Sequence, residues 1–227
     1  MTVEVWASLV SDGSSQDPRG IAVRAKRLET DGWDGGVLAD SQTLAAEAFT
    51  VLTWCAAQTT TLKLGTGTSN PATRHPSVLA SAAASLQVAS QGRMTLSIGR
   101  GDSSLAYIGA PPVPLSYFER ALATIQAYLR GEEVLREDAA SFLGSLPTNF
   151  DNLAIANAPE TSRLKWLPEG FVKPEFEVVA TGPKVITMAA RHADRIALAV
   201  GGIQNVSNGA WPKPEQNWSG TGAILLL

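Results

Sequence analysis

The sequence predicts an α/β fold in which parallel strands alternate with helices. Short apolar runs of strand length recur along the chain, stretches with helical spacing of apolar residues separate them, and the pair strand-helix repeats five times before a last strand. Strands that are apolar throughout are typical of a parallel sheet that is covered on its faces. Right-handed crossovers then connect the units, and both a doubly wound sheet and a barrel fit this order.

The first half of the chain supplies three strands and three helices. A helix is predicted over residues 18–34, because Pro18 suits a first helical turn and four apolar residues then share one face. Those residues are Ile21, Ala22, Ala25 and Leu28. The other elements are strands at 3–9, 35–40 and 62–68 and helices at 45–59 and 76–90.

The second half continues the alternation around one interruption. Strands are predicted at 94–101, 175–182 and 195–200, and helices at 115–132 and 183–193, with Gly131 closing the first of these helices. The segment 138–174 is rich in Pro, Asn, Ser and Ala and has no sustained period. We interpret it as a long insertion before the fifth strand that lies over one end of the fold, where such insertions often contact substrate.

Composition excludes several classes of protein. The chain has 227 residues, 44% of them hydrophobic, and a net charge of −3 without any basic run, so we expect a sizeable core and no nucleic-acid partner. One cysteine, Cys55, and two histidines, His75 and His192, argue against a disulfide framework and a metal site. The sequence has neither a signal peptide nor an apolar run of membrane length, which predicts a cytoplasmic protein without membrane contact.

The stretch "GTGTSNPATRHP", residues 65–76, places small residues where a buried strand ends. Small residues allow a planar ring to approach the backbone, and Pro76 directs a helix N-terminus to the same end of the sheet. From these residues alone, an ordinary turn capped by Asn70 or Thr73 is the favoured interpretation. Arg74 suits either of two roles, a tie between loops or a contact to an anion.

Three other strand ends carry candidate functional residues. Asp40 ends the second strand, where a carboxylate would be wasted in a core. In "GRGDSS", Asp102 suits a hydrogen bond to a ring or a substrate, or a plain turn. The turn 180–184, "ATGPK", offers helix N–H groups and Lys184 to a phosphate, although many such turns bind nothing. The chain lacks a nucleophile elbow, a P-loop and a complete dinucleotide fingerprint, which disfavours hydrolases and kinases.

Taken together, these strand ends resemble the luciferase-like monooxygenase superfamily. Within it, the sequence is similar to the branch of coenzyme F420-dependent oxidoreductases related to methylenetetrahydromethanopterin reductase. The resemblance covers residues 1 to about 200, and its carriers are "GWDGGVLADSQ", "LKLGTGTSNPATRHPSVLASAAASLQVASQGRMTLSIGRGDS" and "VVATGPKVITMAARHADRI". It implies a TIM-type (β/α)8 barrel and therefore selects a barrel over an open sheet.

The resemblance also implies roles for individual residues. A cis peptide bond between Gly67 and Thr68 would lie beside the cofactor ring, and Asp40 would lie near the reacting face. Asp40 and Asp102 are thus the candidate catalytic residues. The implied cofactor-binding residues follow the third, fourth and fifth strands: Gly67, Thr68, Ser69, Asn70, Gly101, Asp102, Ser103, Ala180, Thr181, Gly182, Pro183 and Lys184.

The implied activity is hydride transfer between C5 of the deazaflavin F420 and a small organic substrate. The cofactor would supply the chemistry, and the protein would orient the reactants and exclude water. Some relatives use FMN and oxygen instead, so an FMN-dependent monooxygenase is one alternative. A non-catalytic, truncated barrel that binds a flavin or deazaflavin is another.

The resemblance stops after residue 200. The tail, residues 201–227, has no helical period, so we expect about six strand-helix units and no seventh or eighth strand of the barrel. Shifting the reading frame of the tail by one base permits a sequence that opens Asp-Pro-Glu and continues with helical periodicity. We hypothesise a frameshift near codon 202. Open edges of the incomplete barrel invite pairing with another chain, and we expect a homodimer.

Overall fold

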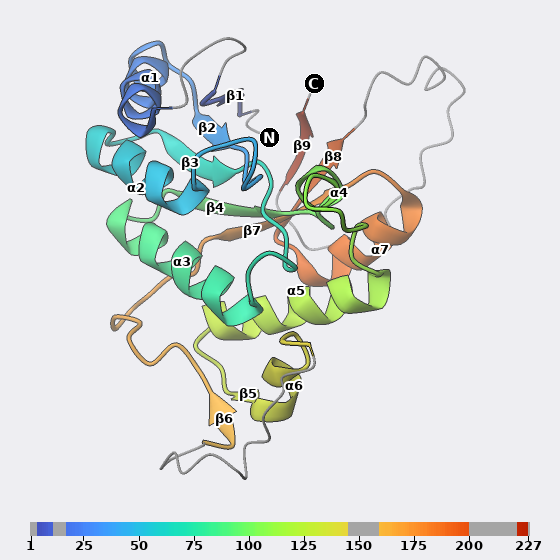
Figure 1. The fold of residues 1–227 in the computed structure, drawn as a ribbon. Helices are drawn as coiled ribbons and strands as arrows, with labels where there is room; N and C mark the ends of the chain where they lie inside the picture. The colour runs from blue at the N-terminus through green and yellow to red at the C-terminus, as the bar shows by residue number, and fades with distance from the viewer. Residues whose placement is uncertain (1–3, 11–16, 145–158, 200–221, 227) are drawn as a thin grey trace.

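A computed structural model describes residues 4–10, 17–144, 159–199 and 222–226 (Figure 1). Its main feature is a curled, parallel, seven-stranded sheet in the order β1-β2-β3-β4-β7-β8-β9. The predicted α/β fold, an incomplete TIM-type barrel, is confirmed. The strands are β1 (Trp6–Ser8), β2 (Gly35–Leu38), β3 (Lys63–Thr66), β4 (Met94–Ile98), β7 (Glu175–Ala180), β8 (Arg195–Ala199) and β9 (Gly222–Leu226).

Five longer helices cover the outer face of the sheet in chain order (Figure 1). Each packs on the next, from α1 through α2, α3 and α5 to α7. None of the helices in the described ranges is long and apolar enough to cross a membrane. The five helices are α1 (Pro18–Thr30), α2 (Ala48–Gln58), α3 (Pro76–Ala89), α5 (Leu115–Leu129) and α7 (Pro183–His192).

Local sequence explains where these helices begin and end. Proline occupies the first turn of α1, α3 and α7, where its missing N–H has no helical partner to lose. The Asp17 carboxylate caps α1 by accepting the Arg19 N–H at 3.0 Å. Gly131, with φ +71°, follows the end of α5 in the left-handed conformation that favours glycine. The apolar face predicted for the first helix is buried as expected.

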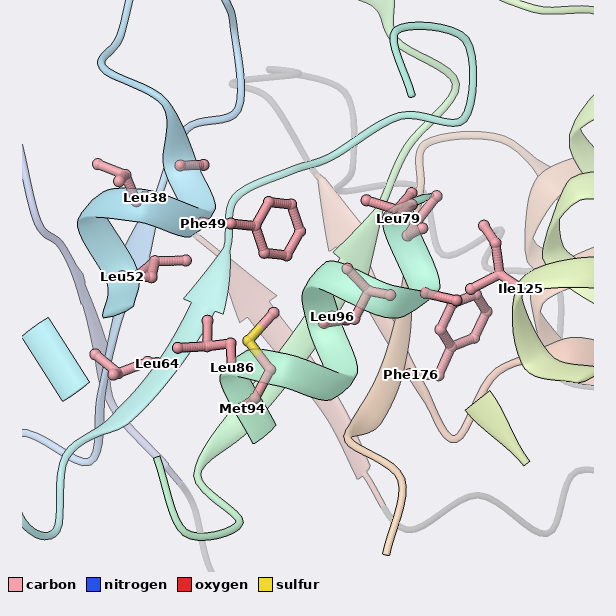
Figure 2. Packing of buried hydrophobic residues seen from close by; sticks show 14 of the residues in the cluster. Leu38, Phe49, Leu52, Leu64, Leu79, Leu86, Met94, Leu96, Ile125 and Phe176 are labelled. Atoms are coloured by element: carbon pink, nitrogen blue, oxygen red, sulfur yellow. The ribbon is translucent and has the colours of Figure 1, made fainter. Parts of the chain in front are cut away.

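The main core lies between the sheet and its helices (Figure 2). Side chains that leave the outer face of the strands, such as Leu64, Leu96 and Phe176, are fully buried. They meet Leu52 on α2 and Ile125 on α5, which are also fully buried. Every residue of β4 is buried, because helices cover one face of this strand and the curled sheet encloses the other.

The inner face of the curled sheet is polar and charged instead. Glu177 on β7 is 5% exposed and accepts a hydrogen bond from Ser97 Oγ on β4 at 2.7 Å. Arg195 on β8, also 5% exposed, donates to Glu175 at 2.6 Å and reaches Glu4 at 3.3 Å.

Trp6 also lies in this interior, beside a small cavity of about 20 Å³ that Glu177 lines as well. A Cβ on Gly35 would lie 2.4 Å from the indole of Trp6, and one on Gly65 would lie 3.2 Å from it. The ring therefore rests directly on the backbones of β2 and β3. The guanidinium of Arg195 lies 5.7 Å from the centre of the indole ring, a cation–π arrangement that links β8 to β1.

The structure adds elements that periodicity did not predict. A short helix, α4 (Asp102–Ala106), follows β4. The strand β5 (Val134–Leu135) precedes the insertion, the helix α6 (Arg136–Ala140) enters it, and β5 pairs antiparallel with β6 (Thr161–Ser162) inside it. Elements of two to five residues are too short to show a period. Within the insertion, residues 145–158 lie outside the described ranges.

The tail also contributes a strand that we did not expect. β9 lies parallel to β8, with Arg195 opposite Gly222 and Ala199 opposite Leu226. A run of five residues without a following helix gives no strand-helix signal, which explains why it was missed. Residues 200–221, where the frameshift hypothesis applies, lie outside the described ranges, so that hypothesis stays a prediction.

We predict that, between acidic and neutral pH, the free energy of unfolding falls less in Glu177→Gln than in the wild type. Burial raises the pKa of Glu177 above its ordinary value of 4.5, although Ser97 and Arg195 lower it. As the pH rises above 4.5, the unfolded chain releases this proton first, so the free energy of unfolding falls until the folded carboxyl also ionises. Urea denaturation from pH 4.5 upward should show this fall in the wild type and a smaller one in the variant.

Glu175→Gln is the matched control, because its side chain is 42% exposed and it pairs with the same arginine. Equal pH profiles for the wild type and Glu177→Gln would contradict the prediction.

Candidate functional site

The carboxyl ends of the parallel strands meet on one side of the sheet (Figure 1). The segment after β3, the helix α4 and the N-terminus of α7 all lie on this side. In α/β folds this is where loops from different strands converge on a ligand. All the predicted site residues follow, or end, strands β2, β3, β4 or β7.

The segment after β3 contains the cis peptide bond implied by the resemblance. The bond between Gly67 and Thr68 is cis, so this prediction is confirmed. The Gly67 N–H donates to Leu38 O at 2.7 Å, and the Ser69 N–H donates to Ser97 O at 2.9 Å. Hydrogen bonds to both neighbouring strands therefore fix the backbone on either side of the cis bond.

Close packing requires small residues here. A Cβ on Gly67 would lie 3.0 Å from Cβ of Val37, and a Cβ on Gly99 would lie 3.0 Å from Oγ1 of Thr68. Gly67 is nevertheless exposed and Thr68 is half-buried. The result is a stretch of bare, accessible backbone at the end of a buried strand, which a flat ligand can approach.

Asp40 lies beneath this stretch rather than at its surface. Its carboxylate is 3% exposed and accepts hydrogen bonds from Ser69 Oγ, at 2.7 Å, and from Arg74. Ser69 is fully buried as well. Asp40 thus connects the end of β2 to the segment after β3.

Arg74 ties loops together, which is one of the two roles left open by the sequence. Besides Asp40 it donates to Glu47 at 2.6 Å, and its guanidinium lies 5.2 Å from the ring centre of Phe49. Glu47 in turn caps α2 by accepting the Thr50 N–H. Burial raises the pKa of Glu47, but the hydrogen bonds from Thr50 and Arg74 hold it below its ordinary value. Sequence analysis missed Glu47 because glutamate is an uncommon helix cap.

Asn70 has a similar supporting role. It is fully buried, and its Oδ1 accepts the backbone N–H groups of Ala72 and Thr73 at 3.0 Å each. Its Nδ2 donates to Ser104 Oγ in α4 at 2.9 Å. Gln42, which follows β2, donates to Ser104 O at 2.9 Å. Asn70, Ser104 and Gln42 therefore join three strand ends, and the turn predicted for this segment is present.

Other predicted residues face solvent at the same end. Gly101 has φ +88° and places Asp102 and Ser103, both exposed, in the first turn of α4. Of the turn before α7, Ala180 is buried, whereas Thr181, Pro183 and Lys184 are exposed. No side chain caps α7 at Gly182, so the first N–H groups of this ten-residue helix are not satisfied by a cap.

The predicted site residues therefore fall into two groups. The buried residues Asp40, Ser69, Asn70 and Ala180 support the backbone. The accessible or half-buried ones lie on three different strand ends: Gly67, Thr68, Gly101, Asp102, Ser103, Thr181, Gly182, Pro183 and Lys184. The accessible group offers bare backbone, a carboxylate and an uncapped helix N-terminus with a lysine, which suits a ligand with a planar ring and a phosphate. The described residues contain no cluster of His, Cys, Asp and Glu that would hold a metal ion.

A family model described as "Luciferase-like monooxygenase" matches residues 1–204. Among curated proteins, the 5,10-methylenetetrahydromethanopterin reductase of Methanolobus tindarius is 34% identical over 130 residues. The match covers 55% of this chain and 39% of that protein. The chain thus spans well under half the length of this relative.

Solved structures with the same fold include the coenzyme F420-dependent tetrahydromethanopterin reductase of Methanopyrus kandleri. Its TM-score is 0.62 at 23% identity, with 87% of this chain and 56% of that chain covered. The oxygenating constituent of 3,6-diketocamphane monooxygenase of Pseudomonas putida, solved in complex with FMN, has a TM-score of 0.63 at 16% sequence identity. Here the match covers 87% of this chain and 57% of the other.

We predict that Asp40→Asn lowers the free energy of unfolding by about 2–3 kcal/mol. The change leaves Arg74, whose side chain is 19% exposed, without its buried partner, while Glu47 still neutralises part of the charge. Urea denaturation measures this loss. The control is Glu132→Gln, which breaks the half-exposed pair with Arg130 and should cost less than about 0.5 kcal/mol. A similar decrease in the free energy of unfolding in both variants would show that the buried pair stabilises the fold no more than the exposed pair does.

Proposed function

Because the chain belongs to the luciferase-like monooxygenase family, we propose that it is a coenzyme F420-dependent oxidoreductase. It would transfer a hydride between C5 of the deazaflavin and a small organic substrate. The observation that carries this proposal is the accessible backbone at Gly67 and Thr68, which lies on the same side of the sheet as Asp102 and the uncapped start of α7 (Figure 1). The relative from Methanopyrus kandleri, which is named as F420-dependent, supports the choice of cofactor.

Each group of residues would have its own task. Gly67 and Thr68 would form the floor for the ring, since Val37 leaves little room for a Cβ on Gly67 and the backbone there is bare. The turn from Ala180 to Lys184 would hold the phosphate through helix N–H groups and the Lys184 charge. When bound, the deazaflavin supplies the hydride-transfer chemistry at its C5 atom. The protein orients the substrate and limits access of water.

The two candidate carboxylates would act differently. Asp102 is exposed in the first turn of α4 and would accept a hydrogen bond from the ring or the substrate, together with Ser103. Asp40 is buried and bonded to Ser69 and Arg74, so it would act as a positioning residue for the segment after β3. Its direct contact with the reacting face stays a prediction.

FMN is the alternative cofactor, because a neighbour in fold is solved in complex with FMN. An FMN-dependent monooxygenase would then be the corresponding activity. We also propose a single domain over residues 1–200 with an atypical tail, a cytoplasmic location and a homodimer. The homodimer is supported by β1, which pairs only with β2 among the described strands and so has a free edge.

We predict saturable binding of F420, weakened about tenfold by Asp102→Ala. Loss of one hydrogen bond between a charged group and the ligand accounts for a change of this size. Titration of the purified chain with F420 and, separately, with FMN, followed by fluorescence, measures both affinities.

Asp31→Ala is the control for this titration, because Asp31 is an exposed residue at the end of α1. Tighter binding of FMN than of F420 would contradict the choice of cofactor. Equal effects of Asp102→Ala and Asp31→Ala would contradict the site.

A further inference from the structure

The last part of the insertion borders a hollow at the end of the fold opposite the candidate site. Residues 163–173, which we call the strap, run from β6 to the start of β7 (Figure 1). A hollow of about 630 Å³ lies between the strap and the last residues of α5. Because the helices run back from the carboxyl ends of the strands, α5 ends near the amino ends. A hollow of this size accommodates a small organic molecule.

Contacts to two helices hold the strap in place. Gln87 Nε2 on α3 donates a hydrogen bond to Val172 O at 3.1 Å. Leu167 packs against the end of α5, where a Cβ on Gly131 would lie 3.5 Å from the Cδ1 atom of Leu167. The hollow is therefore already formed in the folded chain, and a ligand would not have to open it.

Positively charged side chains surround the hollow. Four of the residues that line it are basic and none is acidic: Arg130, Arg163, Lys165 and Lys173. The chain as a whole has a net charge of −3, so these basic residues gather against its overall charge. Lys173 pairs with Asp194. Lys165 is exposed and forms no ion pair with any residue in the described ranges.

The two arginines of the hollow have partners that a ligand can replace. Arg130 pairs with Glu132 and Arg163 pairs with Glu133, and all four side chains are 46–51% exposed. Ion pairs this exposed contribute little free energy, so each guanidinium can turn to an anion at little cost. Glu132, Glu133 and the exposed Glu169 of the strap do not line the hollow. An anion inside it would therefore meet mainly positive charge.

Apolar side chains complete the lining. Leu129 is fully buried, and Leu167 and Phe171 are half-buried. Trp166 and Val172, which belong to the same strap, are 45% and 74% exposed. A bare inorganic anion would leave this apolar surface in water, whereas a ligand with an apolar body would cover it. The hollow thus suits a ligand that combines an anionic group with an apolar one.

We propose that this hollow is a second ligand site, which binds a small organic phosphate with an aromatic or other apolar body. The phosphate would contact Arg163 and Lys165, since guanidinium and ammonium groups form strong, charge-assisted hydrogen bonds to its oxygens. The apolar body would lie against Leu167 and Phe171. The site is at the other end of the strands from the candidate site, so the proposal does not rest on the proposed function.

The test uses 1-naphthyl phosphate as the probe, with inorganic phosphate and 1-naphthol as its two halves. Isothermal titration of the 227-residue chain gives the dissociation constant of each. We expect 1-naphthyl phosphate to bind at least about tenfold more tightly than either half, because only this probe makes both the charged and the apolar contacts. Equal affinities for 1-naphthyl phosphate and either half would contradict the proposal.

The variant Arg163→Gln/Lys165→Gln should weaken binding of 1-naphthyl phosphate by about tenfold or more. Both side chains are exposed, so the fold should survive the change. The control is Arg27→Gln/Arg191→Gln, which removes the same charge from side chains that are 81% and 60% exposed on α1 and α7. This control should leave the affinity unchanged.

An unchanged affinity in Arg163→Gln/Lys165→Gln, or an equal decrease in the control, would overturn the inference. A decrease in Lys184→Gln alone would place the probe at the candidate site and would also overturn it. Sedimentation of the chain with phosphatidylglycerol vesicles, without binding of soluble 1-naphthyl phosphate, would assign the strap to a membrane surface and contradict a site for a small molecule.

Discussion

Ion pairs inside the curled sheet connect strands that are distant in the sheet order. Arg195, at the start of β8, reaches Glu4, which precedes β1, and Lys63 at the start of β3 pairs with the same Glu4. A buried charge such as that of Arg195 is costly unless it is paired, so its pair with Glu4 favours a curvature that brings β8 and β1 together. A flat sheet would separate Arg195 from Glu4, because β1 and β8 are not neighbours in it, and would leave Arg195 only its partners Glu175 and Glu177 on β7.

This curvature makes the strand ends converge. The ion pairs lie at the amino ends of the strands, and the candidate site lies at the carboxyl ends. There a second set of buried polar residues, Asp40 with Ser69 and Asn70 with Ser104, fixes the backbone that the accessible residues occupy. The ion pairs and the candidate site thus lie at opposite ends of the strands, as is usual in barrels of this type.

Sequence predicted the repeated units well, because buried strands and amphipathic helices each leave a period. It also placed the strand ends, and the resemblance located the cis bond between Gly67 and Thr68. The sequence did not distinguish residues that support the backbone from residues that a ligand can reach. Both Asp40 and Asp102 are aspartates at strand ends, yet Asp40 is 3% exposed and Asp102 is open to solvent. Partners that are distant in sequence, such as Glu47 for Arg74, leave no pattern in the local sequence. The strand β9 leaves none either.

The central claim is that segments after β3, β4 and β7 form one binding site in this chain, although it spans only part of its relatives. Hydrogen–deuterium exchange with and without F420 tests this most directly. The account predicts that F420 slows exchange together in residues 67–70, 101–104 and 181–186, while β5 and β6 stay unchanged. Protection in only one of the three segments, or in none, would contradict it.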